Sequence, residues 1–176
     1  MIRPEDFKQL KAFARQDALL LSGVWIASFA SVVAVPESVI GLLLALSTPF
    51  VASWCLLRFR NNVLDGVISF RRGFAYCFYL FTYASLIFAL AQFIYFRWID
   101  NGQFIAMLTD SVRTMEPIYE QNGLNASELY STLEVMKGMS PVEWTFMLMM
   151  QNFIIGFILS IPIAVFCARK NKTNQS

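Results

Sequence analysis

The sequence predicts an all-α membrane protein in which four transmembrane helices form an antiparallel bundle with an amphipathic helical loop on its outer side. Its 176 residues are 57% hydrophobic and only 15% charged, whereas soluble domains carry about 25% charged residues. The apolar residues also fall into four blocks, each close to the roughly 20 residues that cross about 30 Å of hydrocarbon. These observations predict a single membrane domain over residues 1–176.

The predicted spans cover about residues 18–35, 39–57, 74–96 and 144–168. Only Pro36, Glu37 and Ser38 separate the first two spans, so these spans must be antiparallel neighbours. Ser69 is a candidate cap for the third span, and Ser140 with Glu143 for the fourth. The amphipathic segment before the first span, residues 4–17, is expected to lie at the membrane surface or to form a solvated lead-in turn.

The distribution of basic residues predicts the orientation. Most of the 14 lysines and arginines lie in residues 1–17, 58–73 and 169–176. Short cytoplasmic segments are enriched in Lys and Arg, so both termini and the middle loop are expected in the cytoplasm. An even number of spans agrees with that arrangement.

The outer loop, residues 97–143, is the only sizeable aqueous segment. Apolar residues from Phe104 to Met115 keep helical spacing until Pro117, which we expect to interrupt the helix. Asn125 and Glu128 resemble a capping box before a second apolar stripe. We therefore expect two amphipathic helices across the outer mouth of the bundle, where they cap it or bind a partner.

Small residues recur at every fourth position of three spans, which favours close helix packing in lipid. The same stripes also favour self-association, and the sequence leaves both open. The stripes are Gly23, Ala27 and Ser31; Gly41, Ala45, Pro49 and Ser53; and Gly156, Ser160, Ala164 and Ala168.

Four polar residues inside the spans are candidates for an intramembrane cluster: Thr48, Gln92, Gln151 and Asn152. They are expected either to hydrogen-bond between helices or to line a pocket for a polar ligand. No charged residue lies in the middle of a predicted span. This argues against an ion-driven pump formed by one copy, but not against a pore formed by several.

The sequence contains no pattern typical of an enzyme, so we predict neither catalysis nor a cofactor nor a metal site. Histidine is absent and the three cysteines occur singly, which removes the common nucleophile–base pairs and metal motifs. The net charge of +2 gives no reason to expect nucleic acid as a partner.

The middle loop carries four arginines at the expected inner headgroup level: Arg58, Arg60, Arg71 and Arg72. We expect them either to contact lipid phosphates or only to fix the orientation of the chain.

Four short patterns stand in and around this loop: Arg58-Phe59-Arg60-Asn61-Asn62, Ile68-Ser69-Phe70, Gly73-Phe74 and Tyr95-Phe96-Arg97-Trp98-Ile99-Asp100. Together they resemble a known family of unknown function, DUF4199. The resemblance implies a small inner-membrane protein of Bacteroidota with four spans, a short first turn and a helical outer loop. It implies no activity. Family members commonly carry a small residue or Gln in place of Arg71 and Arg72, so the chain departs there.

The leading functional expectation is a non-catalytic accessory or assembly protein for another membrane component. The alternatives are a small oligomeric transporter or channel and a lipid-binding membrane protein. The expected partners are membrane lipids and either another membrane protein or a second copy of the chain.

Overall fold

The computed structural model describes residues 4–36, 38–123 and 125–169. The predicted basic termini and first turn lie partly outside the described residues, at positions 1–3, 37 and 170–176. The described helices are α1 (Pro4–Ala34), α2 (Ile40–Leu46), α3 (Thr48–Val63), α4 (Phe70–Ile94), the π-helix η1 (Tyr95–Ile99), α5 (Gln103–Gln121), α6 (Ser127–Lys137) and α7 (Pro141–Cys167). No strand occurs among these residues, so the all-α prediction is confirmed.

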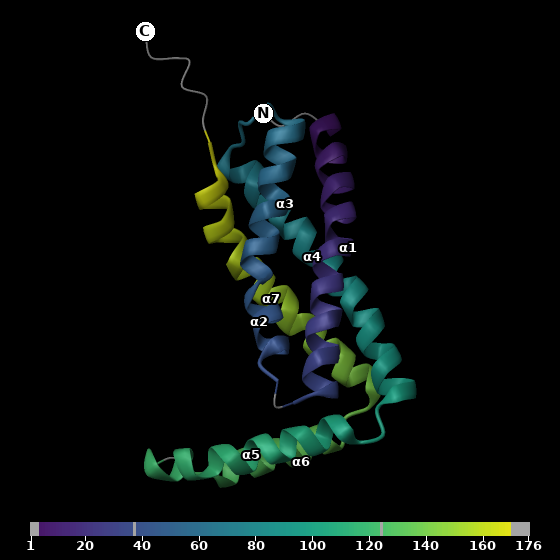
Figure 1. Ribbon diagram of the computed structural model, residues 1–176, viewed down its shortest axis with the longest axis vertical. Helices are drawn as coiled ribbons and strands as arrows, with labels where there is room; N and C mark the ends of the chain where they lie inside the picture. Colours follow the sequence, from purple (N-terminus) through teal and green to yellow (C-terminus); the bar gives the residue numbers. More distant parts are fainter. Residues whose placement is uncertain (1–3, 37, 124, 170–176) are drawn as a thin grey trace.

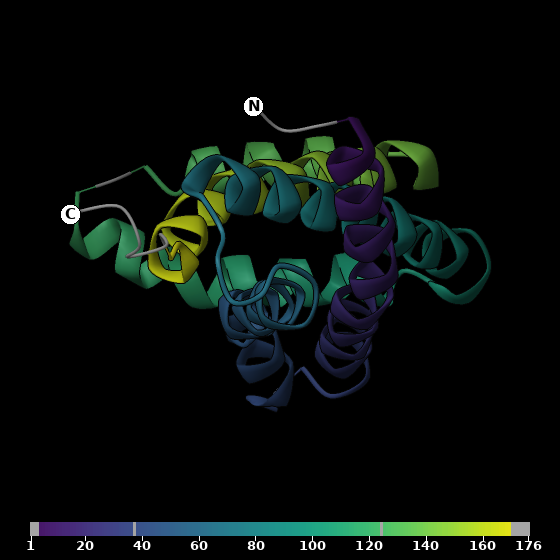
Figure 2. The ribbon, with the colours of Figure 1, turned by 90° about the horizontal axis from the view of Figure 1, so that it is seen from above.

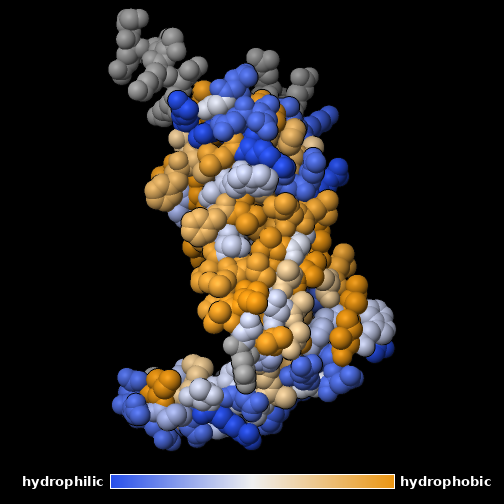
Figure 3. Space-filling model, viewed as in Figure 1, coloured by the Kyte–Doolittle hydropathy of each residue, from blue (hydrophilic) through white to orange (hydrophobic). Residues whose placement is uncertain are grey.

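Four helical segments are long and apolar enough to cross a membrane: Phe7–Ala34, Ile40–Val63, Phe70–Ile99 and Pro141–Cys167. Figure 1 shows them as a bundle in which successive segments run in opposite directions. Figure 3 shows a hydrophobic band across the middle of this bundle, with hydrophilic surface at both ends. The four predicted spans are therefore confirmed, although each is longer than expected.

The bundle has two layers. α4 and α7 run side by side and are tilted relative to α1 and α3, which form the other layer (Figures 1 and 2). Gly156 lets α4 and α7 approach closely, because a Cβ atom at this position would lie 2.6 Å from Cβ of Phe81. Ser160 and Ala164 continue this buried line, so the small-residue stripe predicted for the fourth span is a packing surface.

The stripe predicted for the first span is not a packing surface within the chain. Gly23 and Ala27 are exposed, and nothing approaches a Cβ atom at Gly23 within 4 Å. α1 instead packs through Leu21, Trp25 and Ser28, which occupy a different face of the helix. In the second span, Gly41 packs closely against Val32 of α1.

Of the two expectations for residues 4–17, the solvated lead-in turn is wrong. These residues form the first turns of the continuous helix α1, which stays within the bundle (Figure 1). Leu10, Ala14 and Asp17 are buried on the side of the helix that Leu21 continues. The basic side chains of Lys8, Lys11 and Arg15 are exposed, and this explains the amphipathic pattern of the segment.

The second span is broken into α2 and α3 at Ser47. Pro49 lies in the first turn of α3 and has no N–H to donate to the preceding turn. The break is therefore placed by the proline, inside the hydrophobic band.

Hydrogen-bonded caps start α4 and α7, as the sequence predicted. Ser69 Oγ accepts from the backbone N–H of Arg72. Ser140 and Glu143 form a reciprocal capping box at α7, with Ser140 N–H 2.7 Å from Glu143 Oε2. These caps fix where the third and fourth spans begin.

α5 and α6 form the expected helical pair at the end of the bundle away from the chain termini (Figure 1). Phe104 at the start of α5 packs against Phe96 and Trp144, so this part of the pair covers the bundle. The distant part leaves apolar residues such as Ile118 exposed.

Two details of the outer loop differ from the prediction. Pro117 lies inside α5, because the loss of one N–H near an exposed helix end does not stop the helix. The predicted capping box at Asn125 and Glu128 is wrong, since Asn125 Oδ1 accepts from the N–H of Ser127, only two residues ahead.

Candidate functional site

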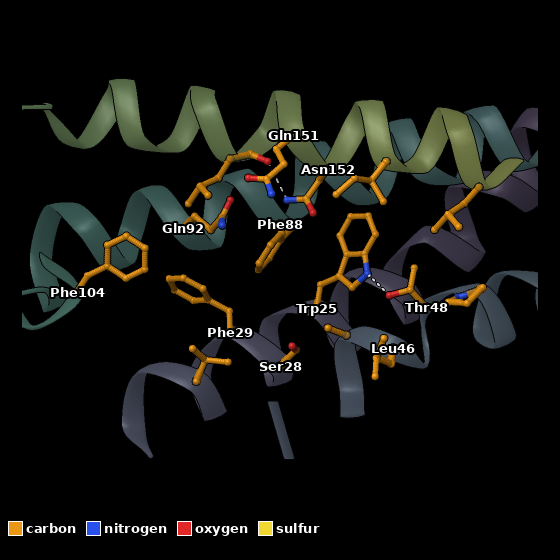
Figure 4. Close-up of a pocket in the computed structure, with 16 residues that line it drawn as sticks. Trp25, Ser28, Phe29, Leu46, Thr48, Phe88, Gln92, Phe104, Gln151 and Asn152 are labelled. Atoms are coloured by element: carbon orange, nitrogen blue, oxygen red, sulfur yellow. Dashed lines mark hydrogen bonds between the residues drawn. The ribbon is translucent and has the colours of Figure 1, made fainter. Parts of the chain in front are cut away.

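A cavity of about 520 Å³ lies between the two layers of the bundle (Figure 4). Both layers contribute to its wall, and residues at the break between α2 and α3 form one side of it. The lining residues are Trp25, Ser28, Phe29, Val32, Ala45, Leu46, Thr48, Pro49, Phe88, Gln92, Phe104, Leu148, Gln151, Asn152, Ile155 and Leu159.

The arrangement of the helices explains why the cavity exists. α2 packs against α1, but its backbone does not approach α7. Because α4 and α7 are tilted relative to α1, the two layers separate near the broken span. Phe29, Phe88 and Phe104 then border the space with aromatic rings.

All four polar residues singled out from the sequence line this cavity: Thr48, Gln92, Gln151 and Asn152. They do not form a cluster bonded to one another. Thr48 Oγ1 accepts a hydrogen bond from Trp25 Nε1 at 2.9 Å, which joins α3 to α1. Asn152 Nδ2 donates to the carbonyl of Leu148 within α7 at 2.8 Å, so one of its two N–H donors is already used.

Gln92 differs from the other three. Its side chain is only 2% exposed, and its Oε1 atom has no hydrogen-bond partner among the residues that the structure describes. The amide points toward the cavity (Figure 4). Leaving a buried polar atom unpaired costs about 1–3 kcal/mol. The cavity therefore presents a buried, unused acceptor on a wall that is mostly apolar.

None of the described residues that line the cavity is charged. The hydroxyl of Ser28 is also occupied, since it donates to the carbonyl of Gly41 at 2.7 Å. An ion entering this space would lose its hydration without gaining an opposite charge. The site is consequently suited to an uncharged molecule.

The four arginines named from the sequence are not equivalent. Arg58 forms an ion pair with Asp17, and Arg60 donates to the carbonyl of Cys167 at 3.0 Å. Arg71 is exposed, and Arg72 uses its backbone N–H in the cap of α4. Of the four arginines predicted to contact lipid phosphates, Arg58 and Arg60 thus use their guanidinium groups inside the protein.

Sequence reasoning missed Asp17, which it assigned to the lead-in segment. Asp17 is 2% exposed and accepts hydrogen bonds from Arg58 of α3 and Tyr76 of α4. The signal was the helical spacing that places Asp17 on the buried face with Leu10 and Ala14. The outward-facing basic residues of the same segment hid that signal.

The described residues contain no group of three or more Cys, Asp or Glu side chains arranged to hold a metal ion. Cys55, Cys77 and Cys167 are all buried. The cavity, with the unpaired amide oxygen of Gln92, is the most distinctive site in the part of the chain that the structure describes.

Comparison with known proteins places the chain in a family. The family model described as "Protein of unknown function (DUF4199)" matches residues 16–169. The chain belongs to the DUF4199 family. The match includes most of the first span, all of the other three spans and every residue that lines the cavity of this DUF4199 protein. No curated protein and no solved structure matches the chain.

Proposed function

We propose that this DUF4199 protein is a non-catalytic membrane protein that binds one uncharged, largely apolar molecule in the cavity between its helix layers. The observation that carries the proposal is the buried Oε1 atom of Gln92, which has no partner among the described residues. A ligand that donates a hydrogen bond to this atom would remove the penalty of leaving it unpaired.

The walls of the cavity define the chemical class of the ligand. The aromatic and aliphatic lining calls for an apolar body, and the absence of charged lining residues favours an uncharged head. The acceptor on Gln92 calls for a hydroxyl or an amide N–H. A neutral lipid with one such donor meets all three requirements, and the bilayer would supply it.

The test is to purify the protein in a mild detergent, record native mass spectra and identify the molecules that organic solvent extracts. We expect the wild-type chain to retain a neutral lipid at close to one molecule per chain. Gln92→Leu removes the acceptor and should weaken retention about tenfold, which corresponds to about 1.4 kcal/mol. Wild-type protein that retains no neutral molecule would contradict the proposal.

Two controls accompany the substitution of Gln92. Gln121→Leu changes the same residue type at an exposed position of α5 and should leave retention unchanged. Thermal unfolding of the Gln92→Leu variant in the absence of ligand should be no easier than that of the wild type, because the variant removes an unpaired buried atom. Lower retention in a stable variant would therefore report on binding rather than on folding.

The exposed small-residue stripe of α1 favours a second candidate, an accessory or assembly role for another membrane component. Gly23 and Ala27 are exposed and Ser31 is half-buried, and nothing lies within 4 Å of a Cβ atom at Gly23. Such faces allow close helix contact in lipid. If native membranes yield no stoichiometric co-purifying protein under gentle conditions, this role fails.

If the protein transports its ligand through the same cavity, the ligand should cross the membrane, whereas binding alone produces no such flux. Reconstituted liposomes would measure it, and Gln92→Leu combined with Asn152→Leu should abolish it if the cavity is the route. Absence of any flux in wild-type liposomes would leave binding as the function of the cavity.

We also propose that the chain lies in a bacterial inner membrane with both termini in the cytoplasm. The concentration of Lys and Arg near the termini and in the segment between α3 and α4 supports this orientation.

A further inference from the structure

A second hollow lies on the surface of the bundle, away from its centre, where α1 crosses α4. This α1–α4 groove has a volume of about 660 Å³ and is separate from the central cavity, with which it shares no lining residue. It is lined by Ala12, Phe13, Arg15, Gln16, Leu19, Tyr83, Leu86 and Ile87.

The groove combines apolar side chains with the polar residues Arg15 and Gln16. On α1, Arg15 and Gln16 follow Ala12 and Phe13 and lie one turn before Leu19. Leu19 and Leu86 are 62% and 50% exposed, and they form an apolar floor beyond Arg15. Figure 3 shows hydrophilic surface giving way to hydrophobic surface along the bundle as a whole.

Arg15 has no acidic partner among the residues that the structure describes. The nearest carboxylate in sequence, Asp17, is directed to the opposite side of α1, where it pairs with Arg58. Lys11, one turn before Arg15, holds its ammonium 4.9 Å from the ring centroid of Tyr79. The groove thus carries the positive charge of Arg15, and Lys11 adds a second positive charge one turn before it, outside the lining residues. No carboxylate within the described residues pairs with either charge.

We propose that the α1–α4 groove binds an acidic phospholipid of the leaflet on the N-terminal side of α1. The phosphate lies against Arg15 and Lys11, and one acyl chain occupies the apolar floor over Leu19 and Leu86. The uncompensated charge argues for an anionic headgroup, because each Lys or Arg near an anionic surface contributes about 1 kcal/mol. The groove volume is within the range of roughly 300–1,000 Å³ that is typical of small-molecule pockets, so it can take part of a phospholipid such as one segment of an acyl chain.

The proposal is tested with the full chain in nanodiscs of phosphatidylcholine that contain a minority of phosphatidylglycerol. Native mass spectra after release from the nanodisc measure which phospholipid stays bound. We expect phosphatidylglycerol to be enriched over its share of the bilayer, and Arg15→Gln to reduce that enrichment about fivefold. Arg97→Gln removes the same charge at the opposite end of the bundle and should have no effect.

A second pair of variants tests the apolar half of the groove without changing any charge. Leu86→Trp fills the floor and should release the bound phosphatidylglycerol. Leu90→Trp, one turn further along α4 and 67% exposed, lies outside the groove and should not. Equal retention of both phospholipids by the wild type would overturn the proposal. So would an equal loss of phosphatidylglycerol in a groove variant and in its matched control.

Because a neutral lipid in the central cavity differs in mass from phosphatidylglycerol, the two sites are distinguished in the same spectra.

Discussion

Asp17 of α1 and Arg58 of α3 form an ion pair inside the bundle. Asp17 also accepts a hydrogen bond from Tyr76 of α4, so one carboxylate joins three helices. Arg58 in turn lies over the ring of Trp54, with its guanidinium carbon 5.0 Å from the ring centroid. The carboxylate is buried, and its charge is balanced by this one arginine.

Asp17→Asn should destabilise the fold by about 2 kcal/mol. Breaking a fully buried pair costs roughly 3–5 kcal/mol, and the loss is smaller here because the Arg58 side chain is 40% exposed. Denaturant unfolding in mixed micelles measures the change. Glu134→Gln breaks an exposed pair with Lys137 on α6 and should cost less than about 0.5 kcal/mol. Equal losses in the two variants would show that the internal pair has no special role.

Gly156→Ala should disrupt the packing of α4 on α7, because the added methyl group would lie 2.6 Å from Phe81 Cβ. Overpacking of this kind typically costs about 1–3 kcal/mol. Gly23→Ala makes the same change where nothing lies within 4 Å, and it should be neutral or stabilising because Ala favours the helix. Thermal unfolding of both variants would measure the difference, and a Gly156→Ala variant as stable as the wild type would contradict the described packing.

The outer helix pair predicts a local pH dependence. The hydroxyl of Tyr130 on α6 donates to Glu116 Oε2 on α5 at 2.7 Å, and this hydrogen bond to the carboxylate raises the pKa of Tyr130. The bond is therefore present below the ordinary tyrosine pKa and is lost as the pH rises through the raised pKa. NMR titration of labelled tyrosine should show that Glu116→Gln lowers the pKa of Tyr130. An unchanged titration would mean that this bond does not form.

The arrangement of the spans can be tested by thiol labelling. The three native cysteines are buried, so a membrane-impermeant reagent should react mainly with introduced thiols. Asn62→Cys at the end of α3 and Glu120→Cys on α5 place exposed thiols at opposite ends of the bundle. Intact cells should label only the second, and inside-out vesicles only the first. Labelling of both from the same side would contradict the four-span topology.

The sequence was sufficient to predict the four spans and the starts of α4 and α7, because hydrophobicity and local capping hydrogen bonds determine them. Long apolar blocks gave the four spans, and the side chains of Ser69 and Ser140 marked the helix starts because their hydrogen bonds are local. The buried stripe of Gly156, Ser160 and Ala164 could also be predicted, since small residues at this spacing favour close packing.

Features that depend on which face of a helix meets its neighbour could not be predicted. The first-span stripe at Gly23 and the fourth-span stripe at Gly156 have the same pattern. Of these two, only the fourth-span stripe is buried. Hydrophobicity cannot distinguish them, because lipid and protein interior are both apolar. Asp17 was missed for a different reason, because the exposed basic residues of the same segment made it look solvated.

The candidate site was partly predictable. Thr48, Gln92, Gln151 and Asn152 stand out because polar residues are rare inside apolar spans, and the structure brings them to one cavity. Which of them has a partner could not be predicted. Trp25 occupies the hydroxyl of Thr48 only because of how α1 and α3 are placed, and this contact leaves Gln92 as the distinctive group.

The central claim is that the cavity holds a molecule, and filling it tests that claim most directly. Ile155 lines the cavity, whereas Ile158 on the same helix is 58% exposed and lies outside it. Native mass spectra of Ile155→Trp and Ile158→Trp would measure the bound neutral lipid per chain. We predict that Ile155→Trp loses the lipid and that Ile158→Trp retains it at the wild-type level. Equal retention by the two variants would contradict the claim that the cavity is the binding site.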